Sequence, residues 1–195
     1  TRRALIIGNQ AYGDRPLDNA VNDARDLTKS LENLGYEVTL KEDLGKRRFL
    51  KEVKKFSKTI EQGDEVVFYY SGHALEYLGV NYITPIGAKI NAAHEIIEKS
   101  VNVNDVLSQV RGNNSGVNIL ILDACRDNPF RGNIGLNVGD SNTNYLQLAP
   151  NTYASFATSP GTVADDGTGD NNSPFTKSLL SHIETTGITI SEVFQ

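Results

Sequence analysis

The sequence alternates short, mostly apolar runs with longer stretches in which apolar residues recur every three or four positions. Residues 3–8, 65–70 and 117–122 are runs of the first kind, and they predict buried strands. Residues 20–34 and 49–60 have the second pattern, which predicts amphipathic helices. Strands that alternate with helices predict an α/β fold, in which a mostly parallel sheet is covered by helices on both faces.

The remaining elements are expected from weaker signals in the sequence. They are a strand over 36–40, a hairpin over 75–86, a helix capped by Asn104, a strand over 153–157, and a helix that begins at Ser173-Pro174 and ends at Gly187. The stretch 126–151 is rich in Asn and Gly and is predicted to be a long mobile loop.

Length and composition limit the class of protein. The 195 residues suit a single domain over 1–195, and 38% hydrophobic with 22% charged residues is ordinary for a globular chain. A net charge of −5 argues against nucleic acid as the main partner. No apolar run approaches the roughly 20 residues that cross a membrane, and no secretory leader is visible. The lone cysteine fits a reducing compartment, so we expect a cytoplasmic protein.

The only cysteine, Cys125, follows the apolar run 117–122, and His73 follows the run 65–70. The carboxyl ends of parallel strands meet at one edge of a sheet, where ligands bind. A cysteine nucleophile needs a nearby imidazole and backbone N–H donors for the oxyanion, here those of Cys125 and Ala74. Taken singly, such a cysteine is usually inert core and such a histidine structural. Their joint placement, 52 positions apart, predicts a catalytic pair.

Five motifs along the chain resemble those of one family. They are Asn-Ala-Val-Asn-Asp-Ala at 19–24, Tyr-Tyr-Ser-Gly-His at 69–73, Asp-Ala-Cys-Arg-Asp-Asn-Pro-Phe at 123–130, Ala-Thr-Ser-Pro-Gly at 157–161 and Asn-Ser-Pro-Phe at 172–175. Together they are similar to the motifs of caspase-like cysteine peptidases, in the prokaryotic metacaspase or orthocaspase branch.

This resemblance implies the caspase-like fold and its chemistry. A large-subunit-like part over about 1–131 and a small-subunit-like part over about 152–195 would flank the loop, with the C-terminus truncated. Cys125 would attack the scissile carbonyl of a polypeptide, His73 would protonate the leaving amine, and water would then hydrolyse the thioester. The chain begins with Thr1 and lacks Met, so a sensor or recruitment domain outside it stays open.

Specificity follows from the residue two positions before the nucleophile. Asp123 shares a strand face with Cys125, and a carboxylate there favours a cationic substrate side chain. The resemblance adds Asp23 and Ser71 to the same pocket and implies cleavage after Arg or Lys, although Asp23 could instead cap a helix or face solvent. Asp165 and Asp166 would lie in the groove-lining loop, where we favour a role as turn residues over acidic subsites.

The sequence also departs from the family. Ala74 replaces the usual glycine after the histidine, and a positive φ there would cost roughly 1 kcal/mol. A catalytically silent domain that binds a partner as a scaffold therefore stays an alternative. A nucleotide-binding domain is disfavoured because residues 8–11 are not a glycine-rich phosphate loop.

No metal or other cofactor is predicted. Parts of the family are activated by calcium, but residues 84–89 and 128–139 contain no carboxylate, which leaves only the aspartates at 165, 166 and 170 for a hard cation. No Lys or Arg lies between Arg131 and Lys177, so an enzyme specific for basic residues would cut its own loop at Arg126 or Arg131.

Overall fold

A computed structural model describes residues 1–112, 116–124, 151–158, 166–167 and 169–193. Its centre is a five-stranded, wholly parallel sheet in the order β2-β1-β3-β7-β8. The strands are β1 (Arg2–Gly8), β2 (Glu37–Glu42), β3 (Glu65–Gly72), β7 (Val117–Ala124) and β8 (Thr152–Phe156). This arrangement confirms the predicted α/β class.

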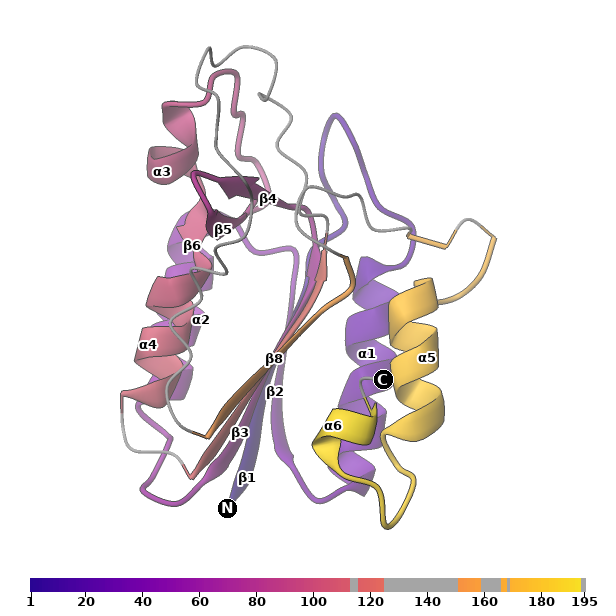
Figure 1. The fold of residues 1–195 in the computed structure, drawn as a ribbon. Coiled ribbons are helices and arrows are strands. Elements are labelled where there is room, and N and C mark those ends of the chain that lie inside the picture. Colours follow the sequence, from indigo (N-terminus) through magenta and orange to yellow (C-terminus); the bar gives the residue numbers. More distant parts are fainter. Residues whose placement is uncertain (113–115, 125–150, 159–165, 168, 194–195) are drawn as a thin grey trace.

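Helices cover both faces of this sheet (Figure 1). One face carries α1 (Ala20–Asn33), α5 (Pro174–His182) and the short α6 (Ile190–Val193), and the other carries α2 (Lys46–Ser57) and α4 (Val103–Arg111). The short α3 (Glu95–Lys99) packs through Ile96 against Leu75 and Tyr82 instead. A small antiparallel sheet of β4 (Ala74–Tyr77), β5 (Val80–Ile83) and β6 (Val101–Asn102) follows β3. The expected hairpin is thus β4 and β5.

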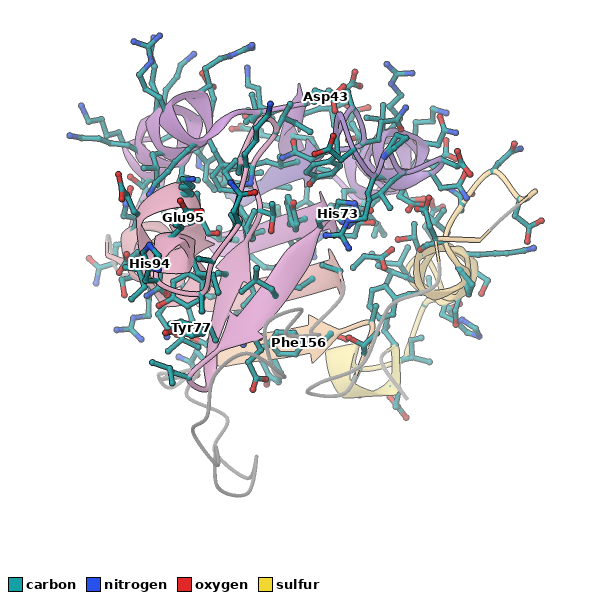
Figure 2. The ribbon with its side chains drawn as sticks, turned by 90° about the horizontal axis from the view of Figure 1, so that it is seen from above. Asp43, His73, Tyr77, His94, Glu95 and Phe156 are labelled. Atoms are coloured by element: carbon teal, nitrogen blue, oxygen red, sulfur yellow. The ribbon has the colours of Figure 1, made fainter. Side chains whose placement is uncertain are left out.

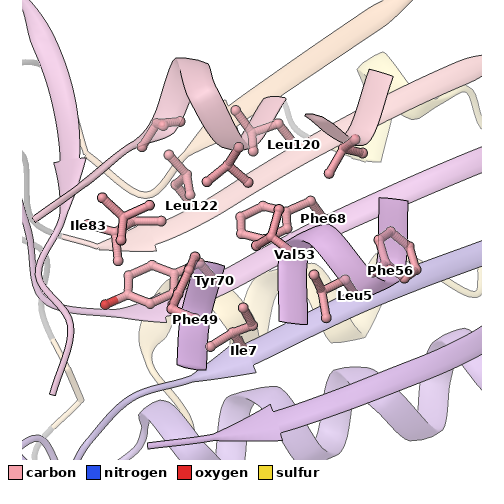
Figure 3. Packing of buried hydrophobic residues seen from close by; sticks show 14 of the residues in the cluster. Leu5, Ile7, Phe49, Val53, Phe56, Phe68, Tyr70, Ile83, Leu120 and Leu122 are labelled. Atoms are coloured by element: carbon pink, nitrogen blue, oxygen red, sulfur yellow. The ribbon is translucent and has the colours of Figure 1, made fainter. Parts of the chain in front are cut away.

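Alternate residues of each strand belong to two separate hydrophobic cores, because successive side chains of a strand point to opposite faces of the sheet. Phe68, Tyr70, Leu120 and Leu122 pack with α2 and α4, as Figure 3 shows. The intervening residues pack with α1 and α5; they are Val67, Tyr69, Ile119 and Ile121. Ser71 and Asp123 continue this second row at the carboxyl end of the sheet, so two polar side chains lie on the α1/α5 face.

Two local predictions need correction. Asn102, not Asn104, caps α4, because its Oδ1 accepts a hydrogen bond from the Asn104 backbone N–H, 2.8 Å away. Helix α5 ends at His182 rather than at Gly187, since Thr185 and Thr186 are poor helix formers. The short elements α3 and β6 carry no sequence signal strong enough to predict them.

Candidate active site

The predicted nucleophile and base follow two strands that end level with each other. In the β3/β7 ladder Ser71 pairs with Asp123, and Gly72 pairs with Ala124. The next residues in the sequence are His73 and Cys125. Cys125 lies outside the described residues, as do Arg126, Arg131 and Asp165. The Cys125–His73 pairing therefore stays a prediction, supported by the register of the strands that lead to it.

The His73 ring is oriented by a backbone carbonyl. Its Nε2 lies 2.7 Å from the carbonyl oxygen of Arg15, in the loop between β1 and α1. A carbonyl can only accept, so Nε2 carries the proton and Nδ1 is the basic nitrogen of the neutral ring. Burial lowers the pKa of His73, against the opposing effect of the bond to Arg15. The imidazole is thus neutral near pH 7, and it lies centrally when the molecule is viewed from above (Figure 2).

Two tyrosines hold the backbone of His73 from beneath. The hydroxyl of Tyr12 accepts a hydrogen bond from the His73 N–H, 3.0 Å away, and the Tyr70 hydroxyl donates to the His73 carbonyl at 2.9 Å. The two hydroxyls are 2.9 Å apart, and the Tyr12 and His73 rings stack at 4.3 Å. Burial raises the pKa of Tyr12 to about 12, so its phenol stays protonated. Both polar atoms of the His73 peptide are therefore fixed.

The glycine before the histidine is required by this tyrosine pair. Gly72 has a φ of +155°, and a Cβ at this position would overlap the Tyr70 hydroxyl and lie 2.8 Å from that of Tyr12. Ala74, in contrast, begins strand β4 and does not adopt a positive φ. The cost expected for an alanine at that place does not arise.

Two carboxylates meet at the first turn of α5. Asp23 of α1 and Asp123 of β7 are 0% and 5% exposed. The Ser173 backbone N–H donates to Asp23 Oδ1 at 3.0 Å, while its hydroxyl donates to Asp123 Oδ2. Ser71 Oγ lies 3.4 Å from Asp23 Oδ2. The fold therefore brings together all three residues predicted to form the pocket.

This carboxylate pair has no cationic partner in the part of the chain that the structure describes. Burial, and next the charge of Asp123, raise the pKa of Asp23 to about 7. Burial also raises the pKa of Asp123, although hydrogen bonds from Ser173 and Thr176 oppose the shift. Two buried acids without a counter-ion favour a cationic ligand.

Comparison with known proteins shows the family to which this chain belongs. The family model described as "Caspase domain" matches residues 1–195. The chain belongs to the caspase family. At the family level this membership implies a cysteine peptidase that acts on polypeptides.

Named relatives of this caspase domain are distant. The chain is 30% identical over 124 residues to the mouse mucosa-associated lymphoid tissue lymphoma translocation protein 1 homolog, covering 63% of this chain and 14% of that protein. The human protein of that name also matches at 30%, over 15% of its length. Mouse caspase-1 is 29% identical over 141 residues, which are 65% of this chain and 35% of caspase-1. The matched part is thus a minor share of each relative.

Asp166 of the caspase domain anchors the start of α1. Its carboxylate accepts hydrogen bonds from the backbone N–H groups of Asp18 and Asn19, and the Asn19 amide donates back to the carbonyls of 166 and 167. This is a turn-fixing role, yet the charge of Asp166 also raises the pKa of both Asp23 and Asp123. The nearby Asp170 pairs with Lys177 at 3.2 Å.

Metal-binding clusters and membrane-spanning helices are both absent from the described residues. No group of three or more His, Cys, Asp or Glu side chains there could hold a metal ion. No helix in the same part of the chain is long and apolar enough to cross a membrane.

Several contacts of the site carry no signal in the sequence. Tyr12 and Arg15 belong to a polar loop, and Arg15 contributes only its carbonyl. Ser173 is predictable as a helix cap, because its hydroxyl accepts from the Thr176 N–H at 3.0 Å, but its bonds to two aspartates are not. Each of these contacts joins segments that are distant in the chain.

Proposed function

We propose that this caspase domain is a cysteine endopeptidase that cleaves polypeptides after Arg or Lys. The observation that carries the specificity is the buried pair of Asp23 and Asp123, which has no cationic partner among the described residues. A guanidinium or ammonium group of the substrate would supply the missing countercharge. An acidic side chain would add a third negative charge to the same place and would be rejected.

The proposed reaction uses the two residues that follow the paired strands. Nδ1 of the neutral His73 ring takes the thiol proton of Cys125, and the resulting thiolate attacks the scissile carbonyl carbon. The backbone N–H groups of Cys125 and Ala74 stabilise the oxyanion. The C–N bond then breaks as the imidazolium of His73 gives its Nδ1 proton to the leaving amine. A water molecule, deprotonated by Nδ1, hydrolyses the resulting thioester and restores the thiol. The Arg15 carbonyl keeps the proton of Nε2 in place throughout.

Self-cleavage within the long loop follows the same rule. Arg126 and Arg131 are the basic residues that precede the stretch without Lys or Arg. A cut made by the enzyme between residues 132 and 176 would contradict basic specificity.

The test compares fluorogenic peptides that end in Arg, Lys or Asp, cleaved by the wild type and by Cys125→Ala, with and without calcium. We expect release after Arg and Lys that disappears in the Cys125→Ala variant. Release after Asp alone would overturn the assignment of Asp123. If no peptide gives release that depends on Cys125, the domain acts as a protein-binding scaffold instead.

A further inference from the structure

We propose that the hydroxyl groups of Ser173, Thr176 and Tyr69 are positioning groups for substrate specificity, which hold the Asp123 carboxylate in one orientation so that its second oxygen faces the substrate cation. This inference rests on the proposed function and extends it to residues that the family motifs did not assign to the pocket.

The three hydroxyls converge on a single oxygen. Asp123 Oδ2 accepts from Ser173 Oγ and from Thr176 Oγ1 at 2.8 Å, and the Tyr69 hydroxyl oxygen lies 3.5 Å from the same atom. Among the hydrogen bonds of the described residues none goes to Oδ1. We therefore assign Oδ1 to the substrate.

The direction of each proton follows from the partners. Ser173 Oγ accepts from the Thr176 N–H at 3.0 Å, so its own proton points to Asp123. Thr176 also has one hydroxyl proton, and it goes to Asp123. The Tyr69 hydroxyl, 2.6 Å from Thr176 Oγ1, must then donate to Thr176. Every proton in this chain points toward Asp123, which suits an ionised carboxylate that only accepts.

These hydroxyls supply the stabilisation that the surroundings lack. Among the described residues, the titratable groups that face Asp123 are Asp23 on α1, Asp166 in the loop before α5, and Tyr69 on β3, and none of these is cationic. Thr176 and Tyr69 are fully buried, so water does not replace a lost donor. Removing one donor therefore favours the protonated acid, which cannot pair with the substrate cation.

The sharpest test is Thr176→Val, which keeps the shape of a fully buried side chain and removes only its hydroxyl. We expect KM for an Arg peptide to rise about 10-fold near pH 7 with kcat nearly unchanged, the typical effect of one hydrogen bond to a charged group. The KM should recover as pH is raised, because Asp123 then ionises. Thr176→Ser should restore wild-type behaviour.

A matched control is Thr28→Val. Thr28 lies in α1, and its hydroxyl donates to the Ala24 carbonyl at 2.8 Å rather than to an aspartate. This variant should leave KM and its pH profile unchanged. Tyr69→Phe removes the outermost hydroxyl and should raise KM by a smaller factor than Thr176→Val. It also carries the test if Thr176→Val does not fold.

A second readout does not need activity. The 13C chemical shift of the Asp123 carboxyl, followed against pH, should show its titration moved upward in Thr176→Val. Folded variants with unchanged KM, pH profile and titration would overturn this inference while basic specificity stands. A wild type that does not cleave after Arg would instead refute the proposed function, and the titration would still decide whether the hydroxyls hold Asp123.

Discussion

Two buried aspartates at opposite ends of the central sheet, Asp64 and Asp123, differ in the charge of the groups around them. Asp64, just before β3, accepts hydrogen bonds from Arg3 Nε at 2.8 Å, from the Thr1 ammonium group at 2.9 Å and from the Glu61 N–H at 2.9 Å. Asp123, near the end of the neighbouring β7, accepts from hydroxyls and faces a second acid, Asp23. One end of the sheet neutralises its buried charge, and the other does not.

The pKa values express this difference. Burial alone would raise the pKa of Asp64, but the Glu61 N–H, the N-terminal ammonium and Arg3 together lower it to about 2. Burial and the charge of Asp123 raise the pKa of Asp23 to about 7, because no cation among the described residues pairs with it. A buried charge without a partner of opposite charge lowers the stability of the fold. Such a charge is most easily explained at a site where a ligand supplies the opposite charge. The comparison therefore separates a structural acid from a pair reserved for substrate.

Asp123→Asn should have the largest effect. Removing one member of a buried ion pair typically costs about 4 kcal/mol, so kcat/KM for Arg peptides should fall roughly 1000-fold. The melting temperature should stay level or rise, because the lost charge has no partner in the free protein. Peptide kinetics and thermal unfolding of the same preparation measure both quantities. A large loss of stability with unchanged kcat/KM would place Asp123 among the structural acids.

Asp64→Asn should show the reverse pattern. It leaves the Arg3 guanidinium without its buried partner, and the free energy of unfolding should fall by roughly 3 kcal/mol. The kcat/KM of the folded fraction should match wild type, since Asp64 lies at the far end of the strand. Denaturant unfolding followed by fluorescence or circular dichroism gives the first number. If the folded fraction loses as much activity as Asp123→Asn does, the proposed difference between the two ends of the sheet is wrong.

Tyr12→Phe tests the support of His73 rather than the acids. The His73 N–H loses its acceptor, and about 1 kcal/mol of positioning energy should appear as a roughly 5-fold lower kcat. KM for Arg peptides should change little, because the pocket is untouched. Tyr153→Phe is the control, since that side chain is 44% exposed. Equal effects of both substitutions would argue against a specific role for Tyr12.

The pH dependence of stability should show the smallest effect. Folded Asp23 keeps its proton up to about pH 7, whereas the unfolded chain releases it near the ordinary pKa of 3.8. The folded state therefore binds more protons between these values, and stability falls as pH rises through this range. Between pH 6 and pH 7 the loss should be roughly 1 kcal/mol. Denaturant titrations at both pH values should show that the free energy of unfolding depends less on pH in Asp23→Asn. If this substitution leaves the pH dependence unchanged, Asp23 is not the group that titrates.

Local patterns in the sequence were enough for the fold class and for most elements. Alternating apolar runs predicted β1, β3 and β7, and helical spacing predicted α1 and α2, because burial imposes these periods on a chain wherever the partners lie. The motifs also named His73, Asp23, Ser71 and Asp123. The pocket residues among them do come together, while the partnership of His73 with Cys125 stays a prediction.

Only the tertiary structure decided how those residues are held. Tyr12 reaches His73 across 61 positions of sequence, and Ser173 reaches Asp123 and Asp23 across 50 and 150. No local period records such contacts, because each depends on strand register and on the packing of α1 against α5. Sequence thus named Asp23 and Asp123 as candidates for one pocket, with a helix cap or a solvent-facing position left open for Asp23. The long-range packing determined that they meet each other, and not a cation, at the first turn of α5.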